Sequence, residues 1–140
     1  MGVERWRRLL PGLWAGWLLC VALLATPAPF AMLASHDAGR VVGRMLGQEA
    51  YTSLALGLVL LLLERTAERR SGGRPFGIGF GLALGTLFCT VAGYFGVQPL
   101  MAAARAGQGA FGFGQLHAAS AVLFVVKLVL VVVLAWRAAR

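Results

Sequence analysis

The chain has 140 residues, of which 59% are hydrophobic and 13% are charged, and its mean hydropathy is +0.79. Charged residues make up about a quarter of an ordinary soluble domain, so this composition excludes a soluble globular protein. A net charge of +8 would suggest nucleic acid in a soluble chain, but here the arginines flank long apolar runs. We therefore expect no nucleic-acid partner. The expected partner is the lipid bilayer, with the chain itself or another membrane protein as a further partner.

Four apolar segments predict an all-α integral membrane protein, because about 20 apolar residues cross a bilayer as a helix. We expect a four-helix transmembrane bundle with up-down topology that forms a single domain over residues 1–140. The expected spans cover residues 9–33, 40–64, 75–98 and 113–136. The connections between these spans are too short to bury a soluble core of their own.

The first span opens at Pro11, a residue suited to the first turn of a helix. Pro27 and Pro29 lie near its far end and are expected to kink or finish it, because proline lacks the N–H that a helix interior needs. The basic start followed by an apolar stretch also imitates a signal peptide. The long apolar run, and Pro29 directly after the nearest cleavage position, favour a first span that is not cleaved.

Asp37 is expected to cap the second helix, which no proline interrupts as far as Arg65. A tight turn then leads into the third span, which is expected to end near Pro99. The turn is formed by Ser71, Gly72, Gly73 and Pro75, and the loop before the fourth span contains Gly107, Gly109, Gly112 and Gly114.

The arginines are distributed unequally between the two ends of the expected bundle. Nine of them lie at one end: Arg5, Arg7, Arg8, Arg65, Arg69, Arg70, Arg74, Arg137 and Arg140. Three lie at the other end: Arg40, Arg44 and Arg105. Trp6 and Trp136 flank the arginine-rich end, as interfacial aromatic residues do. The positive-inside bias predicts that both termini are cytoplasmic and that the protein is a multi-pass protein of the bacterial inner membrane.

Small residues recur at intervals of four on three of the expected helices. Residues four apart share a helix face, and small ones let backbones approach closely in lipid. The ladders are Gly12, Gly16 and Cys20; Gly39, Gly43 and Gly47; and Gly77, Gly81, Gly85, Cys89 and Gly93. They predict a tight bundle or a dimer face, although glycine is also simply common in membrane helices. Both cysteines lie in apolar runs, so we expect packing rather than a disulfide.

Two ionisable residues fall deep inside the expected spans. At about 1.5 Å per residue, Lys127 lies roughly 13 Å and Glu49 roughly 21 Å from the cytoplasmic boundary. Ionisable groups at such depths are costly unless they pair, so these two are the best candidates for an intramembrane polar centre. The other members of this candidate centre are Ser53, His117 and Ser120. The alternative is a Lys127 side chain that reaches back to the surface.

Several imidazole and thioether side chains lie toward the expected non-cytoplasmic side, and such side chains can bind copper or haem. A copper or haem site is therefore an alternative. Its ligands would be His36, His117 and Met101. Methionine is ordinary filler in apolar cores, and no spacing concentrates these ligands, so we expect no metal and no cofactor. No Ser/His/Asp grouping, paired acids or metal-ligand motif predicts catalysis, so we also expect that the protein is not an enzyme.

Short motifs along most of the chain are similar to those of one known family. They are Leu13-Trp14-Ala15-Gly16, Pro27-Ala28-Pro29-Phe30, Ala38-Gly39-Arg40-Val41-Val42-Gly43-Arg44-Met45 with Glu49, Gly93-Tyr94-Phe95, Gln98-Pro99-Leu100-Met101, and Phe113-Gly114-Gln115-Leu116-His117 with Ser120 and Lys127. From Leu13 to Trp136 the chain resembles the bacterial membrane proteins related to transmembrane protein 205. The resemblance implies a four-helix membrane protein of unestablished function and supplies no catalytic residues. Phe124 stands where many relatives have Asn, so no hydrogen-bonding role passes to it.

The leading functional hypothesis is a small membrane component that packs, scaffolds or assists other membrane proteins. A rival hypothesis is a transport or tolerance factor for a metal ion, a proton or a small drug, with Glu49, His117 and Lys127 as its intramembrane binding groups. A third is a redox protein that holds haem or copper through its histidines.

Overall fold

The computed structural model describes residues 2–73 and 76–140, and every regular element within them is a helix. Four helical segments are long and apolar enough to cross a membrane: Gly2–Met32, Ser35–Arg70, Ile78–Arg105 and Phe113–Ala139. The predicted all-α fold with four membrane helices is therefore confirmed. Arg74 and Pro75, which we expected at the turn before the third span, lie outside the described residues, as does Met1.

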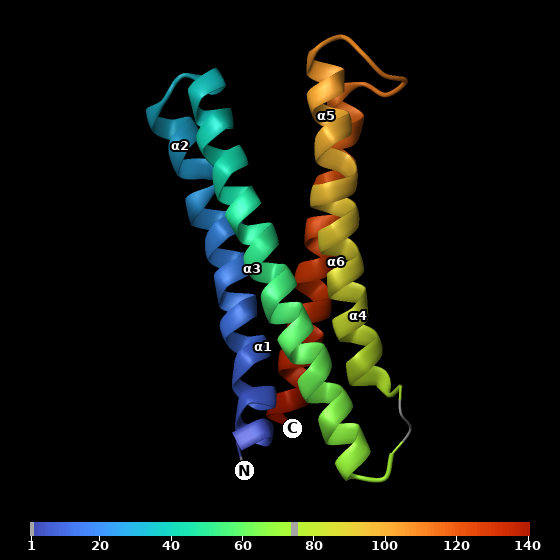
Figure 1. Ribbon diagram of the computed structural model, residues 1–140. Coiled ribbons are helices and arrows are strands. Elements are labelled where there is room, and N and C mark those ends of the chain that lie inside the picture. Colours follow the sequence, from blue (N-terminus) through green and yellow to red (C-terminus); the bar gives the residue numbers. More distant parts are fainter. Residues whose placement is uncertain (1, 74–75) are drawn as a thin grey trace.

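The four segments form a ring in which neighbours run antiparallel. The elements are α1 (Gly2–Cys20), the π-helix η1 (Val21–Ala25), α2 (Pro27–Met32), α3 (Ser35–Arg70), α4 (Ile78–Thr90), the π-helix η2 (Val91–Gly96), α5 (Val97–Arg105) and α6 (Phe113–Ala139). α1 packs on α3 and α6, and α4 also packs on α3 and α6. In this ring α3 and α6 are therefore diagonally opposite each other (Figure 1).

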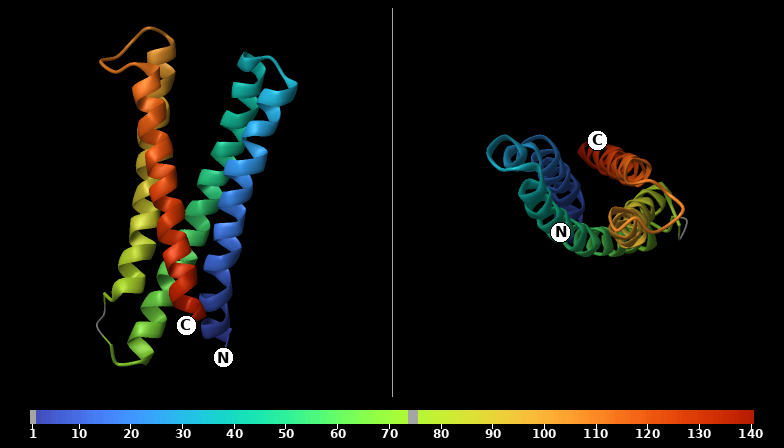
Figure 2. Two further views of the ribbon diagram at one scale, coloured as in Figure 1. Left: turned by 180° about the vertical axis from the view of Figure 1, so that it is seen from behind. Right: turned by 90° about the horizontal axis from the view of Figure 1, so that it is seen from above.

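The two ends of the ring differ in how far the helices stand apart (Figure 1). At the end that carries both termini, the closed end, the segments lie close together. Toward the other end, the open end, α2 stays against α3 and α5 stays against α6, but the two helix pairs diverge (Figure 2). The molecule is thus V-shaped, with each arm of the V a helical hairpin.

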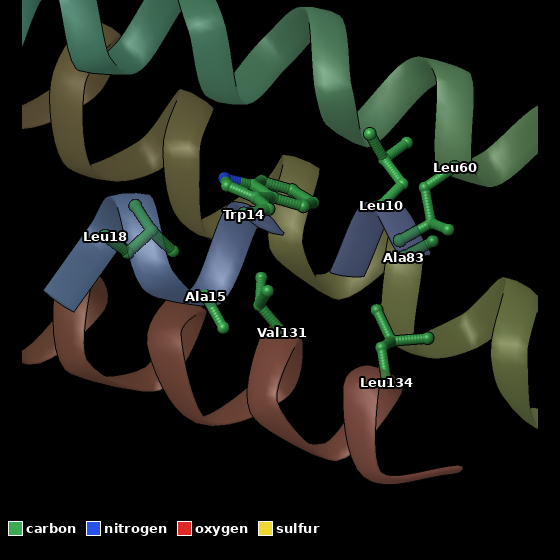
Figure 3. Packing of buried hydrophobic residues seen from close by; sticks show 8 residues of the cluster. All are labelled: Leu10, Trp14, Ala15, Leu18, Leu60, Ala83, Val131 and Leu134. Carbon is green, nitrogen blue, oxygen red and sulfur yellow. The ribbon is translucent and has the colours of Figure 1, made fainter. Parts of the chain in front are cut away.

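The hydrophobic core lies toward the closed end, and Figure 3 shows its side chains. Its buried residues come from α1, α3, α4 and α6: Leu10, Trp14, Ala15, Leu18, Leu60, Ala83, Val131 and Leu134. Trp14 is completely buried. A Cβ atom at Gly57 would lie 2.7 Å from Leu87 Cδ2 and 3.4 Å from Trp14 Cη2. The packing of α1 and α4 on α3 at this level therefore depends on a glycine that belongs to none of the predicted ladders.

Two π-helical turns let the proline-containing segments remain helical. The expected end of the third span near Pro99 is therefore wrong, because that segment continues to Arg105. Pro27 and Pro29, which we expected to kink or finish the first span, lie in its last six residues, and the segment ends at Met32. A proline inside a helix removes an N–H and its ring clashes with the carbonyl four residues earlier. The wider turns of η1 and η2, which precede Pro27 and Pro99, relieve that clash. At the end of η1, the following residue, Thr26, donates its N–H and its hydroxyl to Val21 O at 2.9 and 2.8 Å.

The second membrane helix starts earlier than expected. α3 begins at Ser35 with Ala34 as its N-cap, so the predicted cap at Asp37 is wrong. Asp37 instead lies in the first turn, where a carboxylate suits the helix dipole, and its Oδ1 is 3.5 Å from Nδ1 of His36. The helix can begin at Ser35 because Ala34 adopts a non-helical conformation that redirects the chain.

Candidate functional site

A buried ion pair crosses the centre of the ring. Lys127 Nζ on α6 donates to Glu49 Oε1 on α3 at 2.6 Å, and each residue is only 3% exposed. An unpaired charge at the centre of a bilayer costs about 3 kcal/mol or more. Pairing lowers this cost for both Glu49 and Lys127. Since α3 and α6 are diagonally opposite, the pair ties together two helices that are not neighbours.

Two further side chains complete the hydrogen bonding of this pair. The Ser53 hydroxyl donates to Glu49 Oε1, and Lys127 Nζ lies 3.5 Å from Ser53 Oγ. The indole N–H of Trp14 donates to Ser53 Oγ at 3.1 Å. The network therefore joins α1, α3 and α6. Trp14 was not among the predicted site residues. Its position in an apolar run does not show whether its indole N–H donates a hydrogen bond to a buried group or the ring only packs among apolar side chains.

A cleft of about 660 Å³ lies between the two arms of the V and reaches down to this pair. Ligand-binding cavities of proteins commonly have volumes of about 300–1,000 Å³. All four membrane segments contribute to its lining, which is mostly apolar. Its polar and charged lining residues are Thr26, Ser35, Glu49, Thr90, Tyr94, Gln98, Arg105, His117, Ser120 and Lys127. We call Glu49 and Lys127 the floor of the cleft, and Arg105, Phe113 and His117 its mouth.

The structure brings three of the five predicted polar-centre residues into contact: Glu49, Ser53 and Lys127. Ser120 and His117 line the cleft nearer the open end, about two and about three helical turns above Lys127. The imidazole of His117 is exposed and stacks on Phe113, with 5.9 Å between ring centroids. His117 therefore belongs to the mouth of the cleft rather than to the buried network.

The three residues considered as metal ligands do not meet at one point. His117 and Met101 both line the cleft, whereas His36 is exposed beside Asp37 in the first turn of α3. Within residues 2–73 and 76–140, no group of three or more His, Cys, Asp or Glu side chains is arranged to hold a metal ion.

The glycine ladders divide into positions of close approach and positions with open space. An added Cβ would lie 2.6 Å from Tyr94 Oη at Gly47, 3.0 Å from Leu130 Cδ1 at Gly85 and 3.4 Å from Leu123 Cβ at Gly93. No such neighbour lies within 4 Å at Gly12, Gly16, Gly39, Gly43 or Gly81. The expectation of tight packing inside the bundle is therefore wrong at these five positions, and the alternative of a dimer face stays a prediction there. Cys89 is buried and lines the cleft, while Cys20 is exposed.

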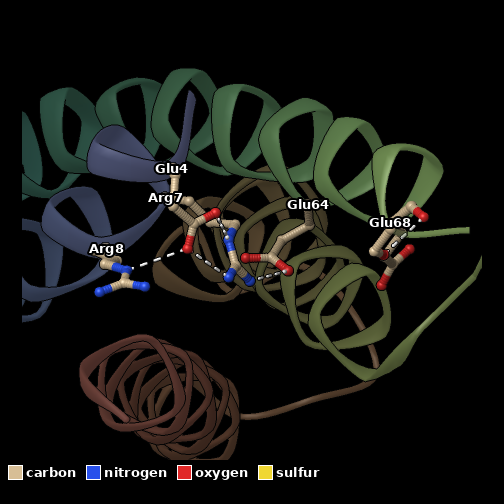
Figure 4. A network of polar contacts seen from close by, with 6 residues as sticks. Glu4, Arg7, Arg8, Glu64 and Glu68 are labelled. Atoms are coloured by element: carbon tan, nitrogen blue, oxygen red, sulfur yellow. Dashed lines mark hydrogen bonds and ion pairs between the residues drawn. The ribbon is translucent and has the colours of Figure 1, made fainter. Parts of the chain in front are cut away.

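A second ionic network fastens α1 to α3 at the closed end (Figure 4). Arg7 lies 2.9 Å from Glu4 Oε1 and 3.5 Å from Glu64 Oε2, and Arg8 lies 3.1 Å from Glu4 Oε1. The Glu64 and Glu68 carboxylates reach over the start of α4, against Gly79 and Gly77, where any Cβ would collide with them. The two glycines thus make room for acidic side chains rather than for a helix backbone. Sequence reasoning missed the contact between Arg7 and Glu64, 57 positions apart, because it depends on how the two helices are rotated about their own axes.

Comparison with known proteins places the chain in a family. A family model described as "Domain of unknown function (DUF4149)" matches residues 9–110, well over half of the chain. The chain belongs to the DUF4149 family. No curated protein and no solved structure matches it. The DUF4149 match includes Glu49 and Ser53 but ends before Lys127, so it covers only one side of the buried pair. With four candidate spans, this DUF4149 chain is a multi-pass membrane protein of a family to which no function is assigned.

Proposed function

We propose that this protein binds small amphiphilic molecules inside the membrane, as a transport or tolerance factor. The observation that carries the proposal is the cleft of about 660 Å³ with the Glu49–Lys127 pair at its floor. A component that only packs against its neighbours gains from a filled interior, because dispersion contacts are lost around any void. Ionisable groups inside a membrane protein, in contrast, commonly serve ligand binding or transport.

The cleft lining favours an amphiphilic molecule over a bare metal ion or a proton. Apolar side chains such as Leu46, Met101 and Phe124 line most of the wall between floor and mouth. A ligand with an apolar part would cover them, whereas a small ion would leave them without contacts. The proposed role is binding and includes no catalytic step.

Three further statements belong to this proposal. Motifs such as the segment from Phe113 to His117 support a relationship to the bacterial proteins related to transmembrane protein 205. The arginine-rich closed end supports cytoplasmic termini. The two together support the bacterial inner membrane as the location. The open end, and with it the mouth of the cleft, would then face away from the cytoplasm.

The test is saturable binding of Nile red, a neutral lipophilic dye, to the protein in phosphatidylcholine nanodiscs. Ala121 lines the cleft, whereas Ala119 is exposed and lies outside its lining. We expect the parent and Ala119→Trp to bind the dye at one site and Ala121→Trp to lose that site, because the indole would fill the cleft. Equal binding by all three proteins, or by empty nanodiscs, would overturn the proposal.

A scaffolding role is the second candidate, and one observation favours it. Gly12 and Gly16 are exposed on α1 with no neighbouring atom near their Cβ positions, so another helix could approach this face closely. Cys20 is exposed one turn further along the same face. In a Cys89→Ala background, oxidative crosslinking through Cys20 should give a dimer that Gly16→Leu abolishes. A chain that stays monomeric under oxidation would exclude self-association through this face.

A further inference from the structure

The charges along the cleft are unbalanced toward positive. Its basic lining residues are Lys127, Arg105 and His117, and its one carboxylate is Glu49. That carboxylate is already paired with Lys127 at 2.6 Å. Among the described residues, no carboxylate lies within ion-pair distance of Arg105. The floor of the cleft is thus internally neutralised, while its mouth carries a cation that has no acidic partner there.

The mouth holds its cationic and aromatic groups in a stack. The Arg105 guanidinium on α5 lies 4.7 Å from the centroid of the Phe113 ring on α6, and Phe113 in turn stacks on His117. A cation–π contact satisfies the flat face of a guanidinium and leaves its N–H donors at the edge. Those donors can form the paired hydrogen bonds that a carboxylate or phosphate accepts. The stack therefore holds Arg105 ready for an anionic group.

Below the mouth, the cleft has the length and the surface of an acyl-chain site. From His117 to Lys127 α6 rises by roughly 15 Å, which is about half of a 30 Å hydrocarbon core. Met101 is buried in the wall of this stretch, and the Phe124 ring lies 4.9 Å from Lys127 Nζ, between the pair and the upper cleft. An apolar chain entering from the mouth would meet these side chains before the floor.

From the charge at the mouth and the apolar wall beneath it, we propose that the ligand is a single-chain amphiphile with an anionic head group. The head group binds Arg105 and His117, and the chain extends along Met101 and Phe124 toward the floor. This inference names the ligand class for the proposed function and rests on it. A free inorganic anion shares the head-group chemistry but would leave the apolar wall without contacts.

The test measures binding of radiolabelled dodecanoate to the full-length protein in phosphatidylcholine nanodiscs, with empty nanodiscs subtracted. Unlabelled dodecanoate, dodecyltrimethylammonium, dodecanol and inorganic phosphate serve as competitors. We expect saturable binding that only dodecanoate displaces well, with at least about tenfold weaker competition by the cationic and neutral compounds and none by phosphate.

Two variants separate the mouth from general surface charge. Arg105→Gln combined with His117→Gln should weaken dodecanoate binding about tenfold or more while leaving Nile red binding unchanged. Arg44→Gln is the matched control, because it removes an exposed arginine near the open end that does not line the cleft. An equal loss in Arg44→Gln, or competition by dodecyltrimethylammonium as strong as by dodecanoate, would overturn the anionic class and leave the Nile red site intact. If Nile red also shows no site in the cleft, the proposed function itself fails.

Discussion

Replacing Lys127 by methionine removes the ammonium that lies 2.6 Å from Glu49 Oε1 and leaves a buried carboxylate without a counter-charge. Removal of one partner of a buried pair costs about 3–5 kcal/mol, whereas removing both together can be nearly neutral. We therefore expect Lys127→Met to lower the thermal stability in mild detergent far more than the double variant with Glu49→Gln does. Circular dichroism melts would check this, with Arg44→Gln as the exposed control. A double variant that loses the sum of the two single effects would show that the groups are not coupled.

Ser53 is the point where the ion pair and the core meet, since it receives the Trp14 indole N–H and donates to Glu49. Ser53→Ala removes both bonds from a site with no exposure, and an unsatisfied buried polar group costs about 1–3 kcal/mol. Thr52→Val, on the exposed side of the same helix, is the matched control and should have little effect. Melting temperature and Trp fluorescence would report the loss. Equal stability of the two variants would mean that the hydroxyl network is not stabilising.

At the residue scale, the contact between Glu49 and Lys127 could be predicted from depth alone. Both positions fall inside apolar runs, and an isolated charge in lipid is unfavourable. Pairing is therefore the arrangement of lowest free energy. The contact of Trp14 with Ser53 and the contact of Arg7 with Glu64 could not be predicted. Their contacts depend on how the helices are rotated about their own axes, and a single sequence does not contain that information.

In α4, one glycine of the ladder packs against a neighbouring helix and another does not. A Cβ at Gly85 would lie 3.0 Å from Leu130 Cδ1 on α6, whereas the same atom at Gly81 meets no neighbour. We expect Gly85→Leu to lower thermal stability in detergent and Gly81→Leu to leave it nearly unchanged, because only the first forces α4 away from α6. A comparison of the two melts checks this. Equal melting temperatures would show that α6 can shift without cost.

Element boundaries were less predictable than element type. The apolar runs identified all four membrane helices, because about 20 apolar residues leave the chain little alternative in a bilayer. The turns at η1 and η2 were not foreseen. Local rules assign proline to helix ends, but in lipid the backbone gains from staying hydrogen-bonded, so a wider turn before Pro27 and Pro99 prevails.

For the whole molecule, the arginine asymmetry predicts that both termini lie in the cytoplasm. Fusions of alkaline phosphatase and of green fluorescent protein to Arg140 would test this, since the first is active only outside the cytoplasm and the second only within it. We expect fluorescence and no phosphatase activity. The same fusions placed in the loop at Gly109 should give the opposite result. Phosphatase activity at Arg140 would reverse the orientation and place the mouth of the cleft on the cytoplasmic side.

The V shape could not be predicted from the sequence. Small residues in regular ladders predict close helices, yet closeness also needs a helix on the other side of each glycine. The described structure supplies one at Gly47, Gly85 and Gly93 but not at Gly39 or Gly43 on the upper part of α3. The cleft between the arms follows from this difference. It is a property of relative helix tilt, which is set by the whole ring at once.

The contact between α1 and α6 has a consequence for biosynthesis. Of the four membrane segments, α6 is synthesised last, so the ring cannot close before it is made. During that interval Glu49 also lacks its ammonium, which follows it by 78 positions. An isolated charge inside lipid is costly, so Glu49 gains its compensating charge only when Lys127 arrives. Assembly is therefore completed in one late event that closes the ring and pairs Glu49 with Lys127, and a nonsense mutation before Phe113 would prevent both.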